Sequence, residues 1–319
     1  MMGQDHPERF APNLISIPSR PIIKKALVDL AAKLTYSAIQ EYKAYQYVCL
    51  ALDAGTVGHS NYLVICLTNA NIKEHPRVLR FRKFFSGDIE DYENELILAL
   101  RECLRLQLVP VGFVGDNLRV QWKAFHEINE RFNTVAIPCG CHTLNLALSD
   151  TRNFDELFYH YCAIVETIAH LFNRKPIKAI FLLTCPLPVE TRWVILFDVS
   201  FWIVTHTQEF IDFLNNENID TIEPLKKYIP MVLECIFEAA PKLVILLLPM
   251  KLLINRLEQD KTSVVDIYTL TKSAMYSLAD IVTGDQQLIS IANHIIECVN
   301  NRLIRTDAGA LQYCYERKR

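Results

Sequence analysis

The sequence predicts an α/β fold in which a mixed β-sheet with flanking helices is followed by a mainly α-helical region. Two apolar runs, 47–53 and 108–114, have the length and content of buried strands, and each leads to a carboxylate, Asp53 and Asp116. Beyond residue 150 the apolar residues recur at helical spacing instead. A sheet in the first half and helices in the second are therefore expected.

Composition limits the classes of protein that this chain can represent. At 319 residues and 51% hydrophobic content, the chain can bury a core of one large or two ordinary domains. The net charge of −3 excludes nucleic-acid binding driven by a global basic field. Ten cysteines without regular spacing, and no signal-peptide pattern, indicate reduced thiols inside a cell. The longest apolar run, 243–250, is too short to span a bilayer, so no membrane partner is expected.

The elements can be placed in chain order. Residues 1–18 are polar and contain three prolines, which predicts a flexible lead-in. A helix is expected from about Pro21 to Tyr42, where an apolar stripe follows a first-turn proline. Three strands at 47–53, 61–68 and, more weakly, 77–84 come next, with Asp53 at or near the end of the first.

The second part of the sheet follows a helix expected at 91–106. A strand at 108–114, a helix, a strand at 134–138 and a further helix complete the predicted core, which spans residues 19–150. Residues 151–319 form the mainly helical region, with apolar stripes at 157–172 and 288–303 and further helices at 197–214, 228–240 and 242–257.

The two carboxylates suggest a metal site. In a three-strand meander followed by a βαβ unit, the first and fourth strands can be neighbours, so that Asp53 and Asp116 meet at adjacent strand ends. Carboxylates suit Mg²⁺, which takes one or two of them together with water and phosphate oxygens. The alternative is that each aspartate only forms a turn after its strand, as aspartates commonly do.

A basic cluster precedes the helix expected at 91–106. It is followed at once by acidic residues at 88–95, so a solvent-exposed edge strand and an acidic first helical turn explain the pattern. The alternative is a strip that binds phosphates of a nucleic acid. The basic residues are Lys73, Arg77, Arg80, Arg82 and Lys83.

Five short blocks in order resemble the catalytic core of the hAT superfamily of DNA transposases. They are Leu50 to Thr56, Asn61 to Val64, Gly115-Asp116-Asn117, Cys139 to Leu146 and Thr191-Arg192-Trp193. The resemblance covers roughly residues 16–202 and implies an RNase H-like fold with a triad of acidic residues. It further implies DNA as partner, Mg²⁺ or Mn²⁺ as cofactor and a nuclear location.

Carried over by position, the resemblance makes Asp53 and Asp116 the first two metal-binding carboxylates. Asn117, Cys139 with His142, and Arg192-Trp193 would be motif residues near the site. Zinc is not expected, because Cys139, Cys141 and His142 lie within four residues and no second ligand pair of the usual spacing exists. His142 is expected instead beside the acidic centre at the start of a helix.

Two departures from the family favour a core fragment without autonomous activity. No third acid with its dimerisation block is found before Arg319, so a homo-oligomer is expected only with such a region. Glu258 is a weak substitute, since its surroundings are typical of an exposed helix end. Residues 1–46 hold no cysteine for an N-terminal zinc finger. The alternative function is a non-catalytic, transposon-derived scaffold that binds DNA or protein.

Overall fold

The computed structural model describes most of the chain between residues 46 and 304. Positions between 21 and 42 that it describes are helical, and Tyr42 among them is buried, its hydroxyl donating to the Leu67 carbonyl at 2.8 Å. The predicted lead-in at 1–18 lies outside the described residues. The described stretches are 46–57, 59–69, 76–84, 87–116, 118–188, 193–215, 226–259 and 264–304.

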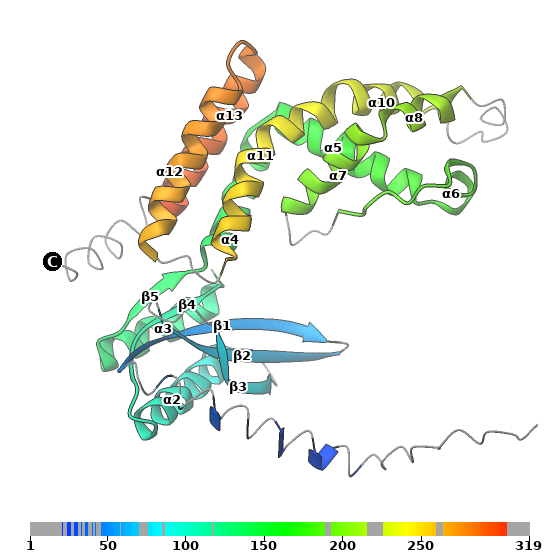
Figure 1. Ribbon diagram of the computed structural model, residues 1–319. Coiled ribbons are helices and arrows are strands. Elements are labelled where there is room, and N and C mark those ends of the chain that lie inside the picture. Colours follow the sequence, from blue (N-terminus) through cyan, green and yellow to red (C-terminus); the bar gives the residue numbers. More distant parts are fainter. Residues whose placement is uncertain are drawn as a thin grey trace, which may run out of the picture.

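A five-stranded mixed sheet forms the first part of the molecule (Figure 1). The order β3-β2-β1-β4-β5 places the first and fourth strands side by side, as the sequence predicted. Strands β1, β2 and β3 pair antiparallel, whereas β4 pairs parallel to β1 and to β5. The strands are β1 (Tyr47–Val57), β2 (Ser60–Thr68), β3 (Arg77–Phe84), β4 (Val109–Gly115) and β5 (Val135–Pro138).

One face of this sheet is covered by two helices, α2 (Ile89–Arg105) and α3 (Arg119–Phe132). Alternate residues of the strands, such as Leu50, Ile65 and Phe113, point at these helices and are fully buried. The carboxylate of Asp88 accepts the Asp91 amide at 3.0 Å and caps α2. The helices thus lie over one face and leave the other face without them.

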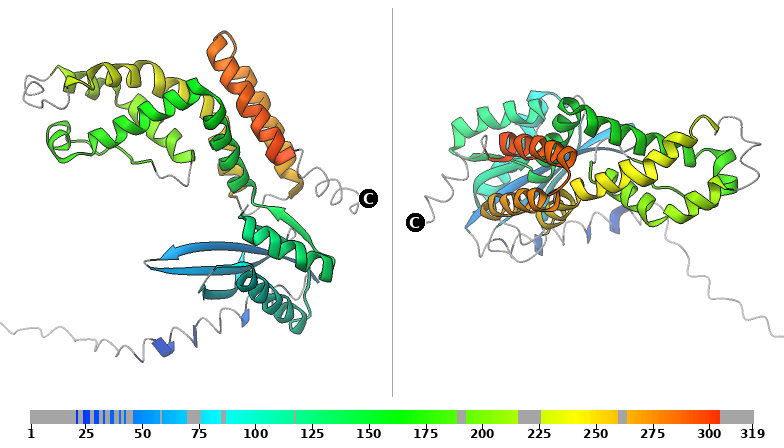
Figure 2. Two further views of the ribbon diagram at one scale, coloured as in Figure 1. Left: turned by 180° about the vertical axis from the view of Figure 1, so that it is seen from behind. Right: turned by 90° about the horizontal axis from the view of Figure 1, so that it is seen from above.

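Helices make up the second part, as predicted, and two of them, α6 and α12, were not foreseen. Figures 1 and 2 show this region extending away from the sheet, with α4 and the end of α11 nearest to it. The helices are α4 (Gly140–Phe154), α5 (Glu156–Phe172), α6 (Lys175–Phe181), α7 (Trp193–Thr205), α8 (Thr207–Leu214), α10 (Ile229–Glu234), η2 (Cys235–Ala239), α11 (Ala240–Leu257), α12 (Val264–Ile281), α13 (Gln286–Val299) and η3 (Asn300–Ile304).

The helical region has its own hydrophobic core. It begins within α4, where Leu144 and Leu148 are buried, and continues to Leu303 at the end of η3. Aromatic rings cluster where α5, α6 and α8 meet: Phe172 lies 4.7 Å from Phe181 and 4.7 Å from Phe210, measured between ring centroids. None of the described helices is long and apolar enough to cross a membrane.

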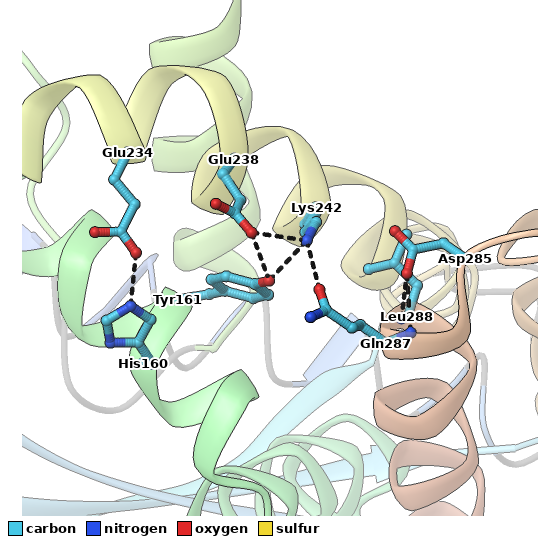
Figure 3. Close-up of polar contacts among 8 residues, drawn as sticks. All are labelled: His160, Tyr161, Glu234, Glu238, Lys242, Asp285, Gln287 and Leu288. Atoms are coloured by element: carbon cyan, nitrogen blue, oxygen red, sulfur yellow. Dashed lines mark hydrogen bonds and ion pairs between the residues drawn. The ribbon is translucent and has the colours of Figure 1, made fainter.

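Polar contacts tie the helices of this region together. Figure 3 shows Lys242 of α11 donating to the Tyr161 hydroxyl of α5 at 2.8 Å, to Glu238 of η2 at 2.9 Å and to Gln287 of α13 at 2.9 Å. Beside this group, His160 contacts Glu234 at 2.7 Å. One ammonium group thereby joins three helical segments, because it can donate three hydrogen bonds.

The packing of α3 beneath β4 gives a test of the sheet core. Phe125 is fully buried and stacks on Phe113 with centroids 5.4 Å apart. Replacing Phe125 with alanine should therefore lower the free energy of unfolding by about 3–5 kcal/mol. Phe132→Ala, on the same helix at 43% exposure, should cost much less. Urea unfolding followed by amide hydrogen exchange in β4 measures both, and equal losses would contradict this packing.

Candidate active site at the carboxyl edge of the parallel strands

Asp53 lies within β1 and not at its end, so that part of the sequence prediction was wrong. The strand continues to Val57 because β1 and β2 stay paired up to the hairpin turn, where Val57 faces Ser60. Pairing of β1 with β4, by contrast, stops at Ala51 and Val114. Asp53 is exposed, and it lies on the part of β1 beyond Ala51, which no longer pairs with β4.

Asp116 follows β4 directly and reaches the same position along the sheet. Ala51 is in register with Val114, and each aspartate lies two residues further along its own strand. Neighbouring strands are about 4.8 Å apart. The side chain of Asp116 is 28% exposed, and Asp53 is more open to solvent. The register therefore brings the two carboxylates together at one edge of the sheet.

The electrostatics agree with this proximity. Burial raises the pKa of Asp116 above its ordinary value, the imidazole of His142 opposes this shift, and the charge of Asp53 adds to it. The pKa of Tyr92, a buried residue of α2, is raised by its burial and also by both carboxylates. Two negative charges therefore act on the same small volume of the protein.

Two glycines let β4 pack closely against its neighbours. A Cβ atom on Gly112 would lie 2.9 Å from the carbonyl oxygen of Val135 on β5, and one on Gly115 would lie 3.0 Å from Phe125 of α3. Neither contact is available to a larger residue without a shift of the backbone or the helix. The close approach fixes the point at which the chain leaves the sheet and presents Asp116.

The Cys-x-x-His segment lies next to Asp116. The amide of Cys139 donates to the Gly115 carbonyl at 2.8 Å, which holds the end of β5 against the end of β4. Helix α4 then begins at Gly140, and His142 Nδ1 in its first turn is 3.9 Å from Asp116 Oδ1. The segment thus contributes an imidazole to the surroundings of the carboxylate pair.

Two thiols at the start of α4 form a pair that the sequence analysis did not single out. The Cys141 thiol donates a hydrogen bond to Cys139, and this bond, with the His142 amide, lowers the pKa of Cys139 to about 7 against the opposing effects of burial and Asp116. Donating the bond raises the pKa of Cys141. The Cys-Gly-Cys spacing, with its first thiol at a helix start, is the sequence signal that could have indicated this.

The end of α11 also approaches this edge. A Cβ atom on Gly140 would lie 3.4 Å from Leu257 Cδ1, and the charge of Glu258, which follows Leu257, contributes to the raised pKa of Cys141. Within the described part of the chain, however, no three His, Cys, Asp or Glu side chains are grouped so that they could hold a metal ion. Glu258 therefore neighbours the thiol pair without completing a triad there.

The remaining motif residues are placed less closely. Asn117 and Arg192 lie outside the described residues. Trp193 begins α7, whose packing partners are α11 and α5 in the helical region, and its side chain is outside what the structure describes. The structure thus brings Asp53, Asp116, Cys139 and His142 to one edge, and places Trp193 in the helical region.

The basic residues near β3 do not form one strip. Arg80 is in register with Ile65 on the helix-covered face, and its guanidinium pairs with Glu95 at 2.8 Å and Glu102 at 3.3 Å on α2. The charge of Arg80 is therefore balanced by these two glutamates within the protein. Arg82 and Lys83 are exposed, Arg77 is half-buried, and Lys73 lies outside the described residues.

Comparisons with known proteins give no family for this chain. No protein-family model matches the sequence, and a search of curated proteins finds no significant match.

Removing each of two neighbours of Asp116 should shift the pKa of Asp116 in opposite directions. His142→Ala removes a favourable charge and should raise the pKa of Asp116 further, whereas Asp53→Asn removes a repulsive charge and should lower it. Carboxyl carbon NMR titration without added metal measures both. His126→Ala is the control, since His126 is on the solvent side of α3 with its side chain 77% exposed. Shifts of the same sign would contradict the arrangement.

The thiol pair predicts a distinct reactivity. Because the thiolate is the nucleophile, alkylation of Cys139 by iodoacetamide should reach half its maximal rate near pH 7. Cys141→Ala removes the donor and should move this midpoint upward. Cys298 is an internal control, because burial raises its pKa and its alkylation should need a higher pH. Peptide mass spectrometry follows both residues, and coinciding profiles would rule out the thiol pair.

Proposed function

We propose that this chain is the core of a hAT-type transposase, in which Asp53 and Asp116 hold divalent cations against a DNA phosphodiester. The observation that carries the proposal is the register of β1 and β4, which sets the two carboxylates side by side at the carboxyl edge of parallel strands. The ordered sequence blocks then supply the family. A nuclear location and DNA as partner belong to the same proposal.

The sheet supports an RNase H-like fold within this proposal. A meander of three antiparallel strands, followed by parallel strands reached through helices, gives the order β3-β2-β1-β4-β5. In that order the strands that carry the two aspartates are central, and α2 and α3 cover the face opposite to Asp53. A phosphodiester can thus approach the carboxylates from the face that these helices leave open.

The residues present fit Mg²⁺ or Mn²⁺ better than a softer ion. Two carboxylates provide hard oxygen ligands, and such ions complete their shell with water and substrate phosphate oxygens. The charge of Asp53 raises the pKa of Asp116, a repulsion that a cation between them would relieve. Zinc is not proposed, because Cys139, Cys141 and His142 lie within four residues and the sequence offers no second ligand pair of the usual spacing. The bound ion would supply Lewis-acid activation of water or a 3′-hydroxyl.

The protein's own groups would have separate tasks in that chemistry. Asp53 and Asp116 would orient the phosphodiester through the ions that they bind. His142, 3.9 Å from Asp116, favours the ionised form of that carboxyl and so keeps it ready to bind a cation. Glu258 is near Cys141 and would have to move toward the aspartates to act as a third acid. Autonomous strand cleavage is therefore not part of the proposal.

A second candidate is a non-catalytic scaffold derived from such a transposase. It is favoured by one observation: in the described part of the chain, the two carboxylates have no third ligand grouped with them. In this case the sheet and helices would serve as a surface for DNA or protein, and the carboxylates would have no retained role in binding a cation.

Titration calorimetry with Mn²⁺ separates the two candidates. The transposase-core proposal expects binding by the wild-type chain and a loss of at least about tenfold in affinity for Asp53→Asn and for Asp116→Asn, since removing even an outer-shell partner costs that much. Asp280→Asn, at an exposed position on α12, is the control and should bind as the wild type does. Identical titrations for all four proteins would favour the scaffold.

A further inference from the structure

The face of the sheet opposite to α2 and α3 carries a row of side chains that leads to the carboxylates. Residues that pair directly across strands share a face, and Phe81 of β3 pairs with Val64 of β2, which pairs with Asp53 of β1. At about 4.8 Å per strand, Phe81 stands about 10 Å from Asp53 across the sheet. The row ends at Asp116, beyond Asp53.

An aromatic pair stands at the other end of this row. Tyr62, two residues before Val64, is on the same face, and its ring stacks on that of Phe81 with centroids 5.2 Å apart and planes 10° apart. Phe81 is 61% exposed, and Val78 on the same strand is 50% exposed. The stack therefore presents a flat aromatic surface to solvent, although burying these side chains would stabilise the fold.

The charge beside the aromatic pair is basic. Lys83 pairs with Tyr62 across the strands, lies on the same face and is exposed. Arg82 is exposed too, but it pairs with the buried Leu63 and therefore lies on the helix-covered face. Two of the acidic residues that follow in sequence form hydrogen bonds at the start of α2: the Asp88 carboxylate accepts the Asp91 amide at 3.0 Å, and the Asp91 carboxylate accepts the Gly87 amide at 3.1 Å. An anion can therefore approach Lys83 beside an aromatic surface.

We propose that Phe81 and Tyr62 form a stacking platform for the bases of an unpaired nucleic-acid strand, with Lys83 contacting its phosphates. This site deepens the proposed function and rests on it for the choice of nucleic acid as the partner. A base can stack on an exposed ring whatever its identity, and such platforms beside basic groups are how proteins hold single strands. A duplex keeps its bases inside its own stack and cannot offer them to the rings.

The position of the platform defines its role. A strand held at Phe81 and running along the row Phe81, Val64, Asp53 reaches the carboxylate pair within a short distance. The net charge of −3 gives no long-range attraction for a polyanion, so stacking must supply a large part of the affinity. The platform thus selects unpaired DNA next to the site of phosphodiester chemistry.

Fluorescence anisotropy with a labelled oligothymidine in EDTA tests the platform without any metal. Phe81→Ala should weaken binding roughly five- to hundredfold, because an aromatic–base stack is lost, and Phe81→Trp should retain it. Phe237→Ala is the matched control, since Phe237 is 63% exposed but lies in η2 of the helical region. Circular dichroism checks that each variant is folded.

A strand of equal length without bases distinguishes stacking from charge. The wild type should bind this abasic strand about as weakly as Phe81→Ala binds oligothymidine. Lys83→Ala should reduce the salt dependence of binding by about one phosphate contact, whereas Lys123→Ala, on α3 at the opposite face, should not.

Several outcomes would overturn the platform. The first is that Phe81→Ala binds oligothymidine as tightly as the wild type does. The second is that the wild type binds the abasic strand as tightly as oligothymidine, or binds a duplex more tightly than oligothymidine. The third is that Phe81→Trp fails to bind oligothymidine. Because EDTA is present, these results are independent of the Mn²⁺ titration. If the chain binds Mn²⁺ through the aspartates but Phe81→Ala has no effect on strand binding, the proposed function stands and the platform is rejected. If Phe81→Ala weakens strand binding but the aspartates do not bind Mn²⁺, the platform stands and the proposed function is rejected.

Discussion

The parallel pairing of β1 with β4 is the constraint on which the candidate site depends. It joins segments that are far apart in the chain, with Cys49 facing Gly112, and on the other side of β4 the same glycine lets the Val135 carbonyl of β5 approach to a distance that a Cβ atom would block. The pairing fixes how far Asp116 extends relative to Asp53. The parallel pairing of β4 with β5 then places Pro138 opposite Gly115, and Cys139 and α4 follow Pro138 directly. The carboxylates take their positions from the first register, and the thiols and the imidazole from the second.

Helix α4 connects that site to the rest of the molecule. Its first turn holds Cys141 and His142 next to the sheet, while Leu144 and Leu148 are buried in the helical core. Farther along, Asp150 pairs with Arg302 of η3, and Asp155, the residue that ends α4 and caps α5, accepts from His294 at 2.6 Å. Through these two contacts, α13 and η3 fix the position of α4, the helix whose first turn carries the Cys-x-x-His segment.

The sequence allowed the elements to be predicted better than their ends and partners. Short apolar runs, and for 77–84 a rough alternation, indicated all five strands, and helical periodicity indicated most helices, because burial imposes these patterns. The end of β1 was missed because Gly55-Thr56-Val57-Gly58 has the composition of a turn, whereas backbone pairing to β2 continues to Val57 regardless of side-chain polarity. The partner of Arg80 could not be foreseen, since it depends on which face of β3 meets α2. The hydrogen bond between the Cys139 and Cys141 thiols likewise could not be foreseen, since it depends on where α4 begins.

The two faces of the sheet hold their charged residues in different surroundings. On the covered face, Arg80 is neutralised by Glu95 and Glu102, so its charge is not offered to a ligand. On the open face, the carboxylates lie at one end of a row and an aromatic pair beside Lys83 at the other. In the proposed function, the first end would repel a polyanion unless cations accompany it, and the second end would attract it mainly through its bases. Such a surface would discriminate by chemistry and not by total charge, which is consistent with a chain whose net charge is −3.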